Sequence, residues 1–243
     1  MSEGLKDESS GWDESAGAWI AEIGDSGDFG RRWVLDGPML DRIRGRGFSR
    51  ALDVGCGEGR FCRMMQAEGI ATVGIDPTAA LVHRAQSLDP DGDYRIERAE
   101  SFQVEDSAFD LAVSYLTLVD IDDINKAISN IYRALRPGGT FLVANLTSFN
   151  TAGIAEGWRN CGGIVHFPID RYLEQRAIWV EWSGIRIRNW HRPLETYMQS
   201  FLNAGFLLRD FREPSPTGGD PEKIERYRRV PYFLVMEWQK AVA

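Results

Sequence analysis

The chain has 243 residues, of which 43% are hydrophobic and 26% charged, and its formal net charge is −8 at pH 7. This length suits one large α/β domain, and the acidic balance argues against nucleic acid as the main partner. No apolar run is long enough to span a membrane. The three cysteines lack paired metal-ligand spacing, and the N-terminus lacks the apolar core of a signal peptide. Reduced thiols in a cytoplasmic protein without a metal site are therefore expected.

Two helices are predicted before the main domain. The first covers residues 12–23, where apolar side chains recur at helical spacing, and the second covers 34–43, with a proline near its start. They predict an N-terminal helical lid over residues 1–45, followed by a domain over residues 46–243.

Residues 50–76, with the sequence RALDVGCGEGRFCRMMQAEGIATVGID, predict a strand, a glycine-rich turn, a helix and a second strand. Glycines let main-chain N–H groups come close to a ligand, and the helix N-terminus beyond the turn favours negative charge. Asp76 ends the second strand and is able to accept hydrogen bonds from ribose hydroxyls. This unit predicts a nucleotide-like ligand at the carboxyl end of the first strand.

The glycine spacing narrows the choice of ligand. A dinucleotide fingerprint would place its third glycine where Arg60 stands, whereas here Gly59 comes one position early, and the G-K-[ST] of a P-loop is missing. The pattern D-x-G-x-G-x-G from residue 53, followed by Asp76, resembles motif I and the acidic motif of class I S-adenosylmethionine-dependent methyltransferases. Within that family the chain resembles the small-molecule, methyltransferase-11-like type.

The resemblance implies S-adenosyl-L-methionine as the cofactor. The glycine turn would lie beside the methionine moiety, Asp76 would bind the ribose, and Asp53 would lie near the amino acid end. Arg98 replaces the acid that usually opens the adenine-contacting segment, so the adenine contact would come from main chain or from Glu100. The residues expected at the cofactor are Arg32, Asp53, Gly55, Cys56, Gly57, Gly59, Asp76, Pro77, Ala99, Glu100, Ser101, Ser114, Tyr115 and Leu116.

The arginine pair before the second helix has two interpretations. Arg31 or Arg32 would pair well with the cofactor carboxylate, because a guanidinium matches a carboxylate in geometry and charge. Alternatively, the two side chains form a solvated pair beside a helix start.

Predicted strands alternate with helices along the rest of the domain. The strands after the first are expected at residues 71–75, 94–96, 109–113, 140–144, 206–211 and 232–238, and the helices at 61–68, 77–87, 124–135 and 193–203. The segment RALRPGGTFLVA resembles the corresponding part of the family closely. Alternation and resemblance together predict an α/β fold: a Rossmann-like, seven-stranded, mostly parallel sheet with helices on both faces and an antiparallel last strand.

Residues 147–192 interrupt this alternation. Residues 177–182 and 185–190 alternate like strands and are joined by Ser183-Gly184, which predicts a β-hairpin. In the family, a segment at this position covers the substrate, and its tryptophans and arginines suit a planar or anionic small molecule. Alternatively, the tryptophans cover the sheet edge and the arginines face water.

Methyl transfer needs a general base only if the acceptor must lose a proton. His166 and His191 are candidates because the pKa of free histidine lies near working pH, and Tyr115, at the tip of the fourth strand, is a candidate for orienting the acceptor. The acids of Asp120-Ile121-Asp122-Asp123 are expected to cap the following helix, Asp120 among them.

The function expected is transfer of a methyl group to O, N or C of a small metabolite. A non-catalytic protein that binds S-adenosylmethionine or S-adenosylhomocysteine is an alternative, and so is an NAD-dependent oxidoreductase. The residue at position 60 and the lack of a Tyr-x-x-x-Lys pair disfavour the oxidoreductase.

Overall fold

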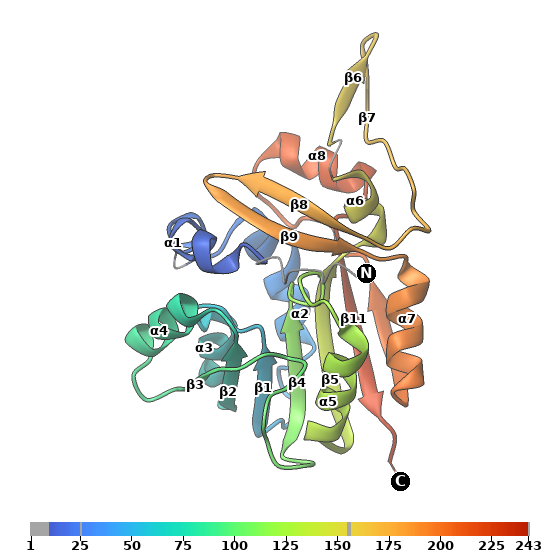
Figure 1. The fold of residues 1–243 in the computed structure, drawn as a ribbon. Helices are drawn as coiled ribbons and strands as arrows, with labels where there is room; N and C mark the ends of the chain where they lie inside the picture. Colours follow the sequence, from blue (N-terminus) through green and yellow to red (C-terminus); the bar gives the residue numbers. More distant parts are fainter. Residues whose placement is uncertain (1–9, 25, 155–156, 243) are drawn as a thin grey trace, which may run out of the picture.

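One mixed β-sheet organises the structure, a computed structural model that describes residues 10–24, 26–154 and 157–242. Its strands are β1 (Arg50–Val54), β2 (Ala71–Asp76), β3 (Asp93–Ile96), β4 (Phe109–Tyr115), β5 (Leu135–Leu146), β10 (Phe206–Arg212) and β11 (Phe233–Lys240). They lie in the order β10-β11-β5-β4-β1-β2-β3 (Figure 1). Within the described residues, no helix is both long and apolar enough to cross a bilayer.

The strand directions confirm the predicted sheet. β1 runs parallel to β2 and β4, and the pairs β2–β3 and β4–β5 are also parallel. The last strand, β11, is antiparallel to both β5 and β10. Every residue of β4 is buried, as expected for a central strand that is covered on both faces.

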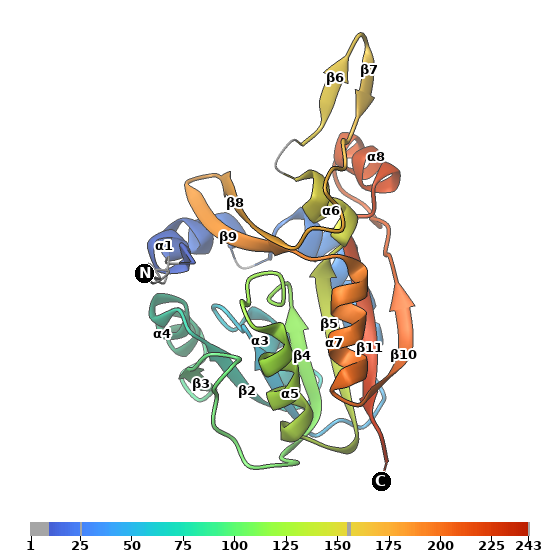
Figure 2. The same cartoon turned by 45° about the vertical axis from the view of Figure 1, so that its right-hand side comes forward.

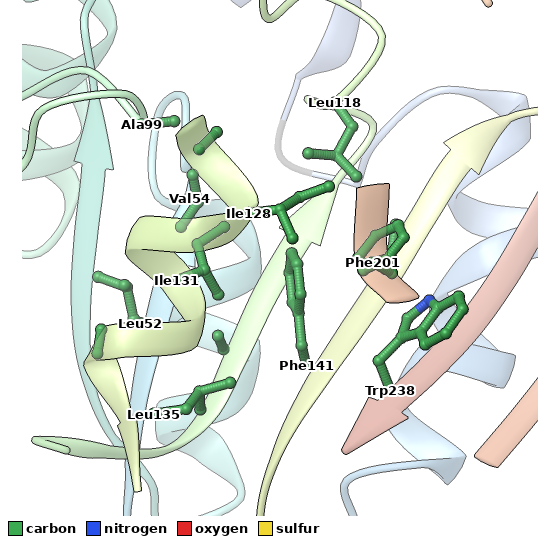
Figure 3. Packing of buried hydrophobic residues seen from close by; sticks show 14 of the residues in the cluster. Leu52, Val54, Ala99, Leu118, Ile128, Ile131, Leu135, Phe141, Phe201 and Trp238 are labelled. Carbon is green, nitrogen blue, oxygen red and sulfur yellow. The ribbon is translucent and has the colours of Figure 1, made fainter. Parts of the chain in front are cut away.

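The helices cover both faces of the sheet. They are α1 (Trp12–Ile23), the π-helix η1 (Arg31–Leu35), α2 (Asp36–Asp41), α3 (Arg60–Ala67), α4 (Ala79–Leu88), α5 (Ile124–Ala134), α6 (Ser148–Gly153), α7 (Leu194–Asn203) and α8 (Pro221–Arg229). On one face α5 and α7 pack against the strands, with Ile131, Phe141 and Phe201 in one cluster, and Phe201 stacks on Trp238 at 4.6 Å between ring centroids (Figure 3). The other face is covered by η1, α2 and α3.

The predicted second helix differs from the observed one. The sequence pattern favoured a single α-helix over residues 34–43, whereas the chain forms η1 and then α2. A π-helical turn inserts residues into the helical repeat, and such turns are frequent at functional sites.

The predicted hairpin is present as β8 (Arg176–Trp182) and β9 (Ile185–His191). Ser183 and Gly184 both have positive φ, 47° and 79°, as a two-residue type I′ turn requires. The hairpin lies across the carboxyl ends of the sheet strands, beside α1 (Figures 1 and 2). Its apolar face packs against α1 through Val180, Ile187 and Trp19.

A second hairpin, β6 (Arg159–Cys161) and β7 (Ile164–His166), was not predicted. It projects away from the sheet in both views (Figures 1 and 2). Three residues per strand are too few to reveal an alternating pattern, and these strands have no buried face that would impose one.

Candidate active site

The glycine turn after β1 has no room for a side chain at two of its glycines and open space at the third. A Cβ on Gly55 would lie 2.1 Å from Thr117, and one on Gly59 would lie 2.6 Å from the ring of Tyr94. At Gly57 a Cβ would meet nothing within 4 Å, and Gly57 lines a pocket. The outer two glycines therefore allow the turn to pack inside the protein, and the middle one leaves main chain bare towards a ligand.

Asp76, at the end of β2, fixes this turn from the other side. Its Oδ2 accepts a hydrogen bond from the N–H of Gly57 at 3.0 Å, and its Oδ1 accepts one from the N–H of Thr78 at 2.8 Å. Each carboxylate oxygen keeps a second acceptor position. Burial raises the pKa of Asp76, and the carboxylate is placed to accept two sugar hydroxyls.

The pocket has a volume of about 800 Å³ and opens where the strand ends meet α1 and the β8–β9 hairpin, a size typical of sites for small molecules. Most of the residues predicted to contact the cofactor line it. They are Asp53, Gly55, Cys56, Gly57, Asp76, Pro77, Ala99, Glu100, Tyr115 and Leu116. The structure thus brings together residues from the ends of β1, β2 and β4.

Four predicted cofactor residues do not line the pocket: Arg32, Gly59, Ser101 and Ser114. Ser114 is fully buried within β4, and Ser101 is exposed on the surface. The inward side chain is that of Arg31, which pairs with Asp28 at 2.7 Å.

The two arginines therefore differ in environment. The Arg31 guanidinium lies 4.9 Å from the ring centroid of Trp19, at the pocket wall. Arg32 is exposed and lies over the ring of Trp33. The two consecutive side chains leave the helix in different directions, so only Arg31 faces the pocket.

The two histidines proposed as bases lie away from the pocket. His191 is fully buried; its Nε2 donates to the carbonyl of Tyr172 at 2.8 Å, and its Nδ1 accepts from the hydroxyl of Thr151 at 2.8 Å. Burial lowers the pKa of His191. His166 ends β7, in the projecting hairpin, with Nδ1 3.4 Å from the carbonyl of Ile164. His191 thus ties the hairpin to α6, and neither ring is placed to receive a proton in the pocket.

Tyr115 is held in the pocket wall by a charged pair behind it. Its hydroxyl donates to Asp36 at 2.8 Å, and Asp36 also accepts from both terminal nitrogens of Arg60, at 3.0 and 2.5 Å. Burial raises the pKa of Tyr115 well above its usual value. The phenol therefore stays neutral, and the lone pairs of its oxygen are available to a ligand donor.

Asp53 carries an unsatisfied acceptor at the floor of the pocket. Its Oδ2 accepts from the thiol of Cys62 at 3.3 Å, while its buried Oδ1 has no hydrogen-bond partner among the described residues. Burial raises the pKa of Asp53 to about 7. A ligand ammonium group would both satisfy this oxygen and restore its charge.

Asp120 also lines the pocket, and its expected role as a helix cap is wrong. The cap of α5 is Asp123, whose side chain accepts from the N–H of Lys126. Asp120 instead accepts a hydrogen bond from Asn189 Nδ2 at 2.5 Å, across a separation of 69 residues. Burial raises the pKa of Asp120 to about 8. No local pattern in the sequence reveals a contact between residues so far apart.

Aromatic side chains form the remaining walls. Trp19 meets Trp12 at 5.0 Å between ring centroids, and Tyr227 stacks on Tyr232 at 3.9 Å. The aromatic residues that line the pocket are Trp12, Trp19, Phe61, Tyr115, Trp179, Trp182, Tyr227, Tyr232 and Phe233. Among residues 10–24, 26–154 and 157–242, no three His, Cys, Asp or Glu side chains gather as metal ligands.

The parallel sheet, the glycine turn and the acid at the end of β2 define a Rossmann-like fold, in which the strand ends are the place where a nucleotide-like ligand binds. Comparison with known proteins identifies the family. Residues 52–143 match the family described as methyltransferase domain. An S-adenosylmethionine-dependent methyltransferase from Mesorhizobium loti superposes with a TM-score of 0.78 at 25% identity, over 89% of this chain and 100% of that one.

Two relatives known from sequence carry methyltransferase names. A malonyl-[acyl-carrier protein] O-methyltransferase from Enterobacter lignolyticus is 28% identical over 72% of this chain and 67% of its own length. A tRNA U34 carboxymethyltransferase from Hahella chejuensis is 30% identical over 65% of this chain and 47% of its own. The chain belongs to the class I S-adenosylmethionine-dependent methyltransferases, and its cofactor is S-adenosylmethionine.

The residues of the pocket fit this cofactor. The open position at Gly57 leaves room for its methionine moiety, Asp76 is able to accept its ribose hydroxyls, and the unpaired Oδ1 of Asp53 suits its ammonium group. Neither alternative considered from the sequence, an NAD-dependent oxidoreductase or a non-catalytic binding protein, is supported by the matches.

Proposed function

We propose that this protein transfers the methyl group of S-adenosylmethionine to O, N or C of a small, planar or anionic metabolite in the cytoplasm. The observation that carries the proposal is the aromatic wall of the pocket: indole and phenol rings line the same space as the cofactor-binding turn. Such rings offer flat apolar faces to a planar acceptor. The free thiols of Cys56, Cys62 and Cys161 support a reducing compartment.

We propose that residues 1–45 and 147–192 act as two covers of this site. Within the described part of these segments, α1 contributes Trp19 and the β8–β9 hairpin contributes Trp179 and Trp182 to the pocket wall. The two elements also share one apolar cluster. A closed cover excludes water, which strengthens electrostatic interactions in the site and prevents hydrolysis.

The cofactor supplies an electrophilic methyl group on a sulfonium. The protein's part is alignment, since an in-line displacement requires the acceptor within about 3–3.5 Å of the methyl carbon. We propose that Asp76 holds the ribose, Asp53 the ammonium group and Arg31 the carboxylate. The aromatic walls would then hold the acceptor in line.

The acceptor is proposed to be a small molecule rather than a nucleic acid. One relative is named for a tRNA, but a net charge of −8 disfavours a polyanion. The O-methyltransferase relatives are named for a malonyl group on an acyl-carrier protein, so an oxygen acceptor is compatible with the family. Arg188 lines the pocket from β9 but is paired with Asp122 at 2.5 Å, so an anionic acceptor would share its charge with that carboxylate.

Labelling tests this proposal. The enzyme is incubated with S-adenosylmethionine carrying a tritiated methyl group and with a cell extract divided into small-metabolite, RNA and protein fractions. Label is expected in the small-metabolite fraction. Label in RNA or protein alone would contradict a small-molecule acceptor.

The role of Arg31 has a matched control in the next residue. Arg31→Ala is expected to weaken S-adenosylhomocysteine binding about tenfold, because a charge-assisted hydrogen bond contributes about 1.5–3 kcal/mol. Arg32→Ala is expected to leave affinity unchanged, since that side chain points outward. Equal effects of both substitutions in calorimetry would rule out this assignment.

A further inference from the structure

Asp120 lies on a loop that is fixed over the cofactor-binding turn. The Thr117 hydroxyl donates to the carbonyl of Gly55 at 3.2 Å, and the N–H of Asp120 donates to the carbonyl of Thr117 at 2.8 Å. From the other side, the N–H of Trp190 in β9 donates to the carbonyl of Val119 at 2.7 Å. The loop is thus held between β1 and the hairpin, with the Asp120 side chain at the pocket wall.

The polar groups that favour the charged form of Asp120 from the elements around it are mostly neutral. Asn189 of β9 donates a hydrogen bond to the carboxyl group at 2.5 Å, and the indole N–H of Trp12 in α1 also lowers its pKa. On its own loop, the nearby Asp122 is already paired with Arg188 of β9, at 2.5 Å.

The charges that act on Asp120 do not favour an isolated carboxylate. Asp76, at the end of β2, disfavours a second negative charge, and Arg31 of η1 offsets this only in part because it is paired with Asp28. Asp13 of α1 adds another acid to the pocket wall. Burial, with the charge of Asp76 in addition, raises the pKa of Asp120 to about 8, so a substantial share of this carboxyl group is protonated at neutral pH.

We propose that Asp120 is the catalytic base, that it ionises when the sulfonium cofactor binds, and that the acceptor is a planar compound bearing a phenolic or enolic hydroxyl. This inference rests on the function proposed above. A flat ring suits the indole walls, and a hydroxyl is the group for which a carboxylate base is useful.

The step balances in atoms and charge. A lone pair of the acceptor oxygen forms the bond to the methyl carbon, the carbon–sulfur bond breaks, and its electron pair remains on sulfur as a neutral thioether. The hydroxyl proton passes to the Asp120 carboxylate. One cation and one carboxylate thus become two neutral groups, and a site that excludes water favours such a loss of charge.

Proton release on ligand binding tests the ionisation without knowledge of the acceptor. S-adenosylmethionine and S-adenosylhomocysteine share the ribose and amino acid groups, so protons released by Asp76 or Asp53 cancel when the two ligands are compared and the titration of each free ligand's own ammonium group is subtracted. Calorimetry in buffers of different ionisation enthalpy measures the difference. At pH 8, a group with a pKa of about 8 is half protonated, so S-adenosylmethionine should release up to about half a proton more.

Three variants show which residue causes the difference in proton release between the two ligands. Asp120→Asn should abolish it, and the amide resembles the protonated carboxyl, so the variant should fold. Asp53→Asn should reduce release by both ligands equally and keep the difference. Asp122→Asn, on the same loop, should also keep it. Equal release by both ligands in the wild type, or a difference that persists in Asp120→Asn, would overturn the proposal.

A second readout concerns the proton transfer. With the small-metabolite fraction as the source of acceptor, Asp120→Asn should lower methyl incorporation about a hundredfold or more, while affinity for S-adenosylhomocysteine stays within a few-fold. Asp120→Glu should restore part of the rate. An Asp120→Asn variant that binds ligand and methylates normally would overturn the role of base, whereas failure of the wild type to bind either ligand would overturn the proposed function itself.

Discussion

At the scale of single residues, Asp76 combines two tasks, because its carboxylate braces the glycine turn and faces the pocket. In Asp76→Asn, one carboxylate oxygen becomes an NH₂ group, which cannot accept from the N–H of Gly57 or Thr78. Affinity for S-adenosylhomocysteine should fall tenfold or more, about the contribution of one charged hydrogen bond. Asp93→Asn is the control, since Asp93 pairs with Arg95 at the surface and should not affect binding. A wild-type affinity in Asp76→Asn, measured by calorimetry, would argue against the ribose contact.

The raised pKa of Asp53 makes stability depend on pH. Because its pKa is about 7 in the folded protein and 3.8 ordinarily, the folded state holds an extra proton between these values. The free energy of unfolding therefore falls as pH rises through this window. Asp53→Asn has no carboxyl group to lose this proton, so its free energy of unfolding should not fall in this way. The difference in free energy of unfolding between the variant and the wild type should therefore increase in favour of the variant by a few kcal/mol from pH 4 to pH 7. Urea unfolding at several pH values would reveal it, and a constant difference between the two proteins would refute it.

At the scale of elements, Arg60 joins α3 to the N-terminal segment. It donates to Asp36 of α2 and to the carbonyl of Ser26, and the Arg60 and Asp36 side chains are only 13% and 15% exposed. Arg60→Ala leaves a nearly buried carboxylate without its counter-charge, so it should cost about 3 kcal/mol.

The matched control for Arg60 is Arg44→Ala. The Arg44 and Glu68 side chains are 52% and 29% exposed, so removal of this surface pair should cost less than about 1 kcal/mol. Guanidinium unfolding of both variants measures the contrast. Similar losses would mean that the Arg60 pair does not anchor the N-terminal segment.

The elements also show how far sequence alone can lead. The helix predicted over residues 124–135 is present as α5, where Ile124, Ile128 and Ile131 are buried against the sheet at helical spacing. The hairpin β8–β9 was predictable from alternation and a two-residue turn. The hairpin β6–β7 was not, because its strands lack a buried face.

The residues of the site also differ in how far the sequence could predict them. The glycine turn and Asp76 belong to a local pattern, so sequence identified them. The role of Asp120 depends on Asn189. The role of His191 depends on Thr151 and Tyr172. Such partners become apparent only when the fold brings distant segments together.

At the scale of the whole molecule, the ligand should stabilise the fold because it binds only the folded state. At about 100 times its dissociation constant, S-adenosylhomocysteine should add about 2.7 kcal/mol. For a chain of 243 residues, this corresponds to a rise in melting temperature of about 5–10 °C. NAD at the same concentration should cause no rise. A shift with NAD and none with S-adenosylhomocysteine, in scanning calorimetry, would contradict the assigned ligand.

The tryptophans around the pocket have a further consequence. Of the eight in the chain, Trp12, Trp19, Trp179 and Trp182 line this one space. Half of the protein's tryptophans, its strongest intrinsic fluorescence emitters, therefore lie where cofactor and acceptor enter. Occupancy, and any movement of α1 against the hairpin, should change the intensity and wavelength of that light, so the enzyme carries its own optical reporter and needs no attached dye.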